Sequence, residues 1–293
     1  MCKQGVAAVS DYLAIGDKIA DFKENHPANY KECVNELLDI LADYFPALQH
    51  NSSPILANMP FWEAEDLAFL IVEYSGWTNE TIHMFLDSRI RMHWERVRNE
   101  IERNVGEEMG ALTCGIPHLE MMRQGHRRDL AIETDNVDHS GVTKYFVRRM
   151  RNIFKHEDNA YGCGALLAFE ATATDEFKIV DRFLRKRKNL IGGELEKGSL
   201  TDLYIAGHVD HEGQSDHPED SHYAGLEEAI GFYITPRNIH RFIQGFLDVC
   251  MNMNMWWEQL TAEIYYRKLK RTQLAVQDSE VIDISEVFKR KSA

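Results

Sequence analysis

The chain has 293 residues, 44% of them hydrophobic, so it can bury one large core in one or two domains. Its formal net charge of −14 argues against binding to nucleic acid or to an anionic membrane, because negative phosphates would repel it. Five cysteines are scattered along the sequence without a CxxC pair. This favours reduced thiols in a cytoplasmic protein over a disulfide framework or a zinc ribbon.

The first residues, MCKQGVAAVSDYL, lack the long apolar core of a signal peptide. No apolar run approaches the roughly 20 residues needed to cross a bilayer. Only seven prolines, long patterns with a period of 3.6 and no sustained strand-like alternation predict an all-α protein. We expect a bundle of about seven to nine helices in a single domain over residues 1–273, and a charged, peripheral tail over 274–293.

Two amphipathic helices are expected over residues 5–23 and 28–49, and a third helical segment ends at Gly76. Thr78 then resembles an N-cap of a long helix that continues to about Glu108. The expected buried line of this helix has apolar residues at steps of three or four: Ile82, Leu86, Ile90, Val97, Ile101 and Val105.

Glu108 follows that apolar line and is therefore predicted to face the core, where an unpaired charge is costly. The alternative is that it reaches solvent at the end of its helix. A loop over 110–117 comes next, and Pro117 is expected to start a short helix with His118 beside it. Residues 125–142 are polar and are predicted to form a surface connection.

Glu170 is the only charged residue between Asn159 and Thr174, in a segment of small and apolar residues that should be packed on nearly all sides. Such a carboxylate is expected to be protonated, paired with a base or bound to a metal. A salt bridge to an arginine is the alternative. The basic run over 182–188 is interpreted as the solvated end of the same helix.

The segment Leu203–Tyr223 holds four of the 13 histidines, interleaved with five carboxylates: His208, His211, His217, His222, Asp210, Glu212, Asp216, Glu219 and Asp220. Imidazole and carboxylate together form the ligand set of iron, manganese or zinc. His208 and Glu212 are four apart, so they share one face of a helix. The alternative is a solvated acidic loop. Closing helices are expected over 219–233 and 237–272, the last with an aromatic and methionine stripe that belongs to the core.

The order of these candidate ligands along the chain resembles that of the heme-oxygenase-like diiron oxidases and oxygenases. The resemblance covers roughly residues 60–260. The stretch EEMGALTCGIPHLEMM is similar to the family's Glu-x-Gly, loop and His segment and nominates Glu108 and His118. ALLAFEATATDEF is similar to its second core helix and nominates Glu170. DLYIAGHVDHEG is similar to the start of its third and nominates His208 and Glu212. The resemblance implies a heme-oxygenase-like helical bundle.

The last ligand departs from the family pattern, which would place a histidine at position 215, where this chain has Ser215. His217 can serve if the helix loosens around Gly213. His222 is the other candidate. On one continuous helix it would lie about 21 Å beyond His208, so it requires the chain to fold back. We predict His217.

The resemblance implies two iron ions per chain, with manganese as an open alternative, and O2 as co-substrate. It implies oxidation of a small metabolite, an amino acid or other carboxylate, by N-oxygenation, desaturation or C–C cleavage. A carboxylate substrate would need a nearby cation, and three arginines are candidates unless they are merely solvated: Arg148, Arg149 and Arg151. A homodimer is left open.

Two alternatives are kept. A ferritin-like diiron bundle uses Glu-x2-His pairs on two helices, and two pairs have that spacing: Glu80 with His83, and Glu219 with His222. A metal-independent protein of the same fold would instead bind a small molecule and keep its histidines for structure.

Overall fold

The computed structural model describes the backbone of residues 16–213 and 222–290, and the side chains of residues 16–208 and 222–274. Within this described part the chain forms 11 α-helices, two short 3-10 helices and no strand. The predicted all-α bundle is confirmed, with more helices than the seven to nine expected. None of the helices in these residues combines the length and apolar composition that a membrane crossing needs.

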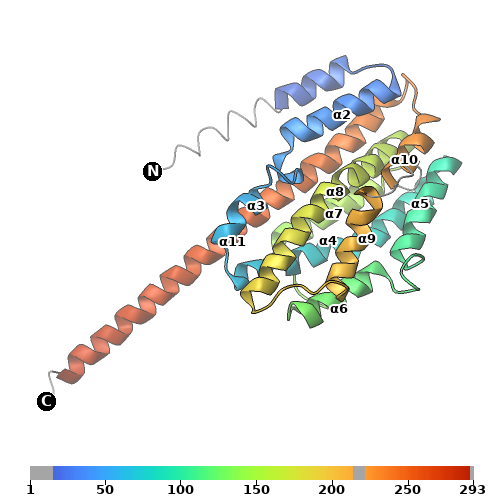
Figure 1. Cartoon of the computed structure of the whole chain (residues 1–293). Helices are drawn as coiled ribbons and strands as arrows, with labels where there is room; N and C mark the ends of the chain where they lie inside the picture. Colours follow the sequence, from blue (N-terminus) through green and yellow to red (C-terminus); the bar gives the residue numbers. More distant parts are fainter. Residues whose placement is uncertain (1–15, 214–221, 291–293) are drawn as a thin grey trace.

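The first helix spans 16–25 and carries no label in Figure 1. The others are α2 (Tyr30–Tyr44), α3 (Pro54–Asn58), α4 (Ala64–Arg91), α5 (Glu95–Glu108), α6 (His118–Asp129), α7 (Gly141–Phe154), α8 (Asn159–Leu190), α9 (Leu200–Gly213), α10 (His222–Gly231) and α11 (Ile239–Arg290). The 3-10 helices are Pro46–Leu48 and Met59–Phe61.

Helices α8 and α11 form the centre of the bundle and pack along much of their length (Figure 1). Two glycines make the close approach possible, because a Cβ on Gly164 would overlap the carbonyl oxygen of Phe242, and one on Gly245 would overlap that of Tyr161. The apolar stripe of α11 belongs to the core, as predicted: Phe242, Phe246, Met253, Trp256, Trp257 and Ile264 are buried. Only Tyr265 of that stripe is exposed.

The segment that was predicted to break at Gly76 is one continuous helix, α4, and the break comes later, at residues 92–94. Gly76 is instead a packing position, since a Cβ there would lie 2.8 Å from Cγ2 of Thr143 in α7. The predicted buried line is correct only after the break. Val97 and Ile101 are buried, whereas Leu86 and Ile90 are exposed.

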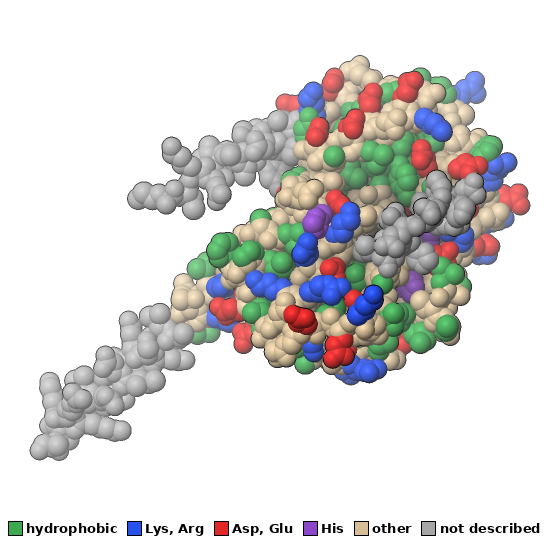
Figure 2. Space-filling view, in the orientation of Figure 1, with side chains coloured by type: hydrophobic (Ala, Val, Ile, Leu, Met, Phe, Trp, Pro, Cys, Tyr) green, Lys and Arg blue, Asp and Glu red, His purple; other side chains and the backbone are tan. Residues whose placement is uncertain are grey.

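The polar stretch 125–142 is also only partly a connection, because α6 continues to Asp129 and His126 is fully buried. Four helices shorter than α8 and α11, namely α5, α6, α9 and α10, cover one side of this central pair. Helix α9 packs on α6 and α8, and α10 packs on α5 and α8. Acidic and basic side chains are interspersed over the face of the molecule shown in Figure 2.

Candidate metal centre

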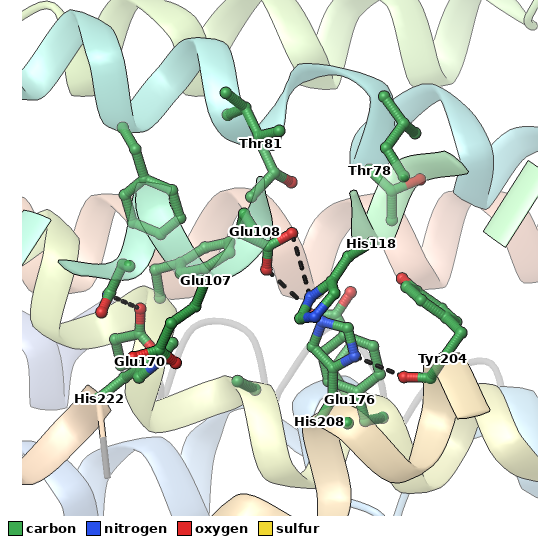
Figure 3. A pocket seen from close by; sticks show the side chains of 18 of the residues that line it. Thr78, Thr81, Glu107, Glu108, His118, Glu170, Glu176, Tyr204, His208 and His222 are labelled. Carbon is green, nitrogen blue, oxygen red and sulfur yellow. Dashed lines mark hydrogen bonds and ion pairs between the residues drawn. The ribbon is translucent and has the colours of Figure 1, made fainter. Parts of the chain in front are cut away.

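A cavity of about 90 Å³ lies among α4, α5, α6, α8 and α9, with His222 of α10 also on its wall (Figure 3). Its aromatic walls come from α4, α8 and α9: Tyr74, Trp77, Phe85, Phe169, Phe177 and Tyr204. Its ionisable side chains are four carboxyls and three imidazoles: Glu107, Glu108, Glu170, Glu176, His118, His208 and His222. Among the described residues no lysine or arginine lines it.

A tight loop brings His118 back to Glu108. Glu108 is the last residue of α5, and His118 is the first of α6. Between them Gly110 has φ of 100°, and a Cβ there would lie 2.8 Å from the backbone of Gly115. Only glycine tolerates both the positive φ and the close approach of the Gly115 backbone. The GALTCGIP sequence therefore builds this part of the site.

Both oxygens of Glu108 face an imidazole nitrogen. Nδ1 of His118 is 3.5 Å from Oε2, and Nε2 of His208 is 3.5 Å from Oε1. One ligand atom from each of the three residues lies within 4.8 Å of the other two. These separations are long for hydrogen bonds. They suit atoms that share one ion, since two ligands about 2.1 Å from a metal lie roughly 3 to 3.5 Å apart.

Contacts other than the one with Glu108 fix the orientation of the His208 ring. Its Nδ1 donates to the backbone carbonyl of Tyr204 at 2.7 Å, and the ring stacks on Phe177 with centroids 3.9 Å apart. With the proton on Nδ1, the neutral ring turns the lone pair of Nε2 toward Glu108. Two acceptors then face each other, and a proton or a metal ion between them relieves the repulsion.

Burial by itself raises the pKa of Glu108, but without metal His118 and His208, each with a proton on the nitrogen that faces the carboxylate, outweigh this effect and hold the pKa well below its usual range. The carboxyl is therefore ionised, as a metal ligand must be. Nδ1 of His118 is buried and has no hydrogen-bond partner among the described residues. The donor set fits a divalent transition metal.

A second trio lies beside the first and joins α5, α8 and α10. Nε2 of His222 is 2.5 Å from Oε2 of Glu107, and its Nδ1 is 3.8 Å from Oε2 of Glu170. Burial lowers the pKa of His222, but the two carboxylates outweigh it and the pKa is raised. Burial raises the pKa of Glu107, and His222 with Arg103 brings it below its usual value.

Glu170 differs from Glu107 in its protonation. Burial raises its pKa to about 7, His222 opposes the rise and Glu108 adds to it. Its Oε1 accepts a hydrogen bond of 2.9 Å from Asn104. The alternative of an arginine salt bridge to Glu170 finds no support among the described residues, where its charged neighbour within 4 Å is His222.

The structure thus brings Glu108, His118, Glu170 and His208 to one cavity. Glu212 belongs to α9, but its side chain lies outside the description, and His217 lies outside the described residues altogether. His222, the other candidate for the last ligand, reaches the cavity because it opens a separate helix. The 21 Å separation of a continuous helix therefore does not apply.

Two cavity residues have no counterpart in the sequence analysis. Glu107 precedes Glu108 and reaches the cavity from the same helix end. Glu176 lies six residues after Glu170 on α8, which is buried on several sides, so both carboxyls are enclosed. The signals that could have found them are the acidic pair EE at 107–108, where the apolar line of α5 ends, and the acidic pair DE at 175–176, which follows Glu170 on α8.

The ferritin-like alternative finds no support at its first pair. His83 is exposed, and Glu80 is 2.5 Å from Arg151 in an ion pair. Arg151 also pairs with Asp87 at 2.6 Å. None of the three arginines considered for a carboxylate substrate lines the cavity.

Comparison with protein families gives one decisive match. The sequence profile of DUF3865, described as a domain of unknown function with a solved structure, matches residues 31–263. The chain belongs to this family. No curated protein matches it.

Two solved structures resemble this DUF3865 protein in fold. Both are crystal structures of a CADD-like protein of unknown function from Nostoc punctiforme PCC 73102, at 1.35 and 2.00 Å resolution. The TM-score is 0.71 for each, with 23% and 24% sequence identity. The matches cover 80% of this chain and 96% and 98% of the other. At this identity the likeness shows a shared fold.

Proposed function

We propose that this DUF3865 protein is a non-heme diiron oxidoreductase that uses O2 to oxidise a small molecule in the cavity. The observation that carries the proposal is Glu108, with an imidazole nitrogen 3.5 Å from each of its oxygens. Carboxylate with imidazole is a ligand set that suits iron and leaves positions open for substrate and O2. The order of these residues in the sequence, similar to heme-oxygenase-like diiron enzymes, adds support.

In this proposal Glu108, His118 and His208 hold one ion. Glu170, His222 and Glu107 hold the second, and Glu212 and His217 stay proposed ligands from the sequence. A bound pair of ferrous ions would supply electrons to O2, which amino-acid side chains alone do not provide.

The chain's own groups prepare the site. The carbonyl of Tyr204 keeps the proton of His208 on Nδ1, so that Nε2 faces Glu108. Without metal Glu170 has a pKa of about 7, so binding of an ion at this trio would release its proton near neutral pH. The aromatic walls limit the contact of the carboxyls and imidazoles with water, which strengthens the electrostatic interactions among them.

Anaerobic loading with ferrous iron, followed by metal analysis and oxygen uptake, tests the proposal. We expect wild type to bind about two irons per chain, as a carboxylate-bridged bundle site does, and to consume O2 only when loaded. Glu108→Gln and His118→Ala should each lose at least one iron and most of the oxygen uptake. Parallel loading with Mn(II) shows which metal the site prefers.

His83→Ala is the matched control, because His83 is exposed and lies outside the cavity. It should bind iron as wild type does, and a loss of iron there would favour the ferritin-like alternative. A wild-type protein that binds no iron, or that consumes no O2 when fully loaded, would replace the oxidase with a metal-independent binding protein of the same fold.

A further inference from the structure

Glu176 is a buried carboxyl inside the cavity, and no cationic side chain among the described residues pairs with it. It is 5% exposed, and its Oε1 has no hydrogen-bond partner among the described residues. The side chain of Trp77 is its hydrogen-bond donor, and burial raises its pKa to about 8. A buried acid with a free oxygen is costly to keep. Within the described residues the carboxyl accepts from Trp77, and its other oxygen is left for a ligand.

The surroundings of Glu176 favour a positive group. Tyr74, Trp77 and Phe177 line the same cavity as Glu176, and aromatic faces attract ammonium ions. The described lining holds four carboxyls, and neither lysine nor arginine. A carboxylate ligand would therefore meet like charge at this end, whereas an ammonium would pair with Glu176 and stabilise its ionised form.

We infer that the cavity binds a small organic amine, with its ammonium group on the free oxygen of Glu176 and its apolar part between the aromatic walls. This inference rests on the proposed function, since it names the substrate class of that site. It replaces the carboxylate-bearing metabolite expected from sequence, for which Arg148, Arg149 and Arg151 were the candidate partners.

The spacing along α8 indicates the length of the ligand. Glu170 and Glu176 are six residues apart, which corresponds to about 9 Å along a helix. An extended alkyl chain of about six carbons covers a similar distance. A ligand of this length can carry its ammonium at Glu176 while its other end reaches the level of Glu170, which lies in the second trio with Glu107 and His222.

The test compares three ligands with one tail and different head groups: n-hexylamine, 1-hexanol and hexanoate. Their affinities for metal-free wild type are measured by calorimetry. We expect hexylamine to bind roughly tenfold more tightly than hexanol, as a charge-assisted pair allows, and hexanoate to bind most weakly. Because no metal is present, a failure here differs from a failure to load iron.

Glu176→Gln keeps the shape of the side chain and removes its charge. It should lower the affinity for hexylamine roughly tenfold and leave that for hexanol unchanged. The exposed Glu157→Gln makes the same charge change outside the cavity and should bind all three ligands as wild type does.

The head-group series on wild type decides the matter even if Glu176→Gln folds poorly. Hexylamine that binds no better than hexanol would overturn the inference. So would a folded Glu176→Gln protein with unchanged selectivity.

Discussion

At the scale of single residues, His126 is a second buried ionisable group, and it lies outside the candidate metal centre. It is 0% exposed, and neither ring nitrogen has a hydrogen-bond partner among the described residues. Burial lowers its pKa to about 4, and Asp129 opposes the shift. The ring is therefore neutral in the folded protein over a pH range in which an unfolded histidine is charged.

This difference predicts a loss of stability in mild acid. An unfolded histidine, with a pKa of about 6.5, binds a proton as the pH falls, and the folded protein does not bind it until the pH nears about 4. Stability from this residue is complete above about pH 6.5 and declines toward pH 4. Between about pH 7.5 and pH 5 the loss amounts to about 2 kcal/mol, measured by urea unfolding.

His126→Leu removes the titrating group, so its free energy of unfolding should fall less over the same pH range. Other groups contribute equally to both proteins and cancel in the comparison. His83→Ala should keep the wild-type pH dependence, since His83 is exposed. Parallel curves for wild type and His126→Leu would show that His126 is protonated in the folded state.

The sequence identifies those site residues that stand alone in apolar surroundings. Glu108 ends an apolar line and Glu170 is the single charge of a buried segment, so their chemical isolation is visible in the sequence. The position of His222 is not visible in the sequence, because it depends on where α9 ends and α10 begins. Glu176 follows Asp175, whose carboxylate binds the backbone of His50, and the sequence does not show which of the two acids faces inward.

At the scale of helices, the break between α4 and α5 shows where local signals fail. Gly76 and Thr78 have the sequence character of a stop and an N-cap, yet the helix continues because Gly76 packs against α7. The true break has neither glycine nor proline. The side chain of Asn159 accepts from the backbone N–H of His93 and donates to the carbonyl of Arg91, at 2.8 and 3.1 Å. A cap from so distant a residue leaves no local pattern.

The crossing of α8 and α11 leads to a second prediction. Gly164→Ala places a methyl group onto the carbonyl oxygen of Phe242, between two backbones that cannot both yield. We expect a loss of about 3 kcal/mol or more in the free energy of unfolding, at the upper end of overpacking effects. Urea unfolding of the metal-free protein measures it.

Gly162→Ala is the matched control, two residues earlier on the same helix. A Cβ there would meet only Cε of Met92 at 3.7 Å, an ordinary contact. Alanine should leave stability unchanged or raise it by about 0.5–1 kcal/mol, since it favours a helix over glycine. Equal losses in both variants would mean that α8 and α11 do not cross closely at Gly164.

At the scale of the whole molecule, α11 both fills the core and extends beyond the bundle (Figure 1). Up to residue 274, where the described side chains end, its last buried apolar residue is Ile264. Further along, Lys268 donates to the carbonyl of Phe61 at 2.7 Å, and Arg271 forms an ion pair with Asp66, which is 1% exposed. The division into a domain and a tail stays a prediction, and these contacts suggest where to test it.

Two truncations on either side of Arg271 test that boundary. A chain that ends after Leu274 keeps the pair of Arg271 with Asp66, so its free energy of unfolding and its iron content should match those of the full chain within about 0.5 kcal/mol. A chain that ends after Arg267 leaves the buried carboxylate of Asp66 without its cation and should lose about 1–2 kcal/mol, because Arg271 is itself partly exposed. Arg271→Ala in the full chain should reproduce most of that loss.

Light scattering on the same samples reports the oligomeric state. If the chain that ends after Leu274 loses stability or changes from dimer to monomer, the segment after 274 belongs to the folded unit or to a homodimer interface, and the tail assignment is wrong.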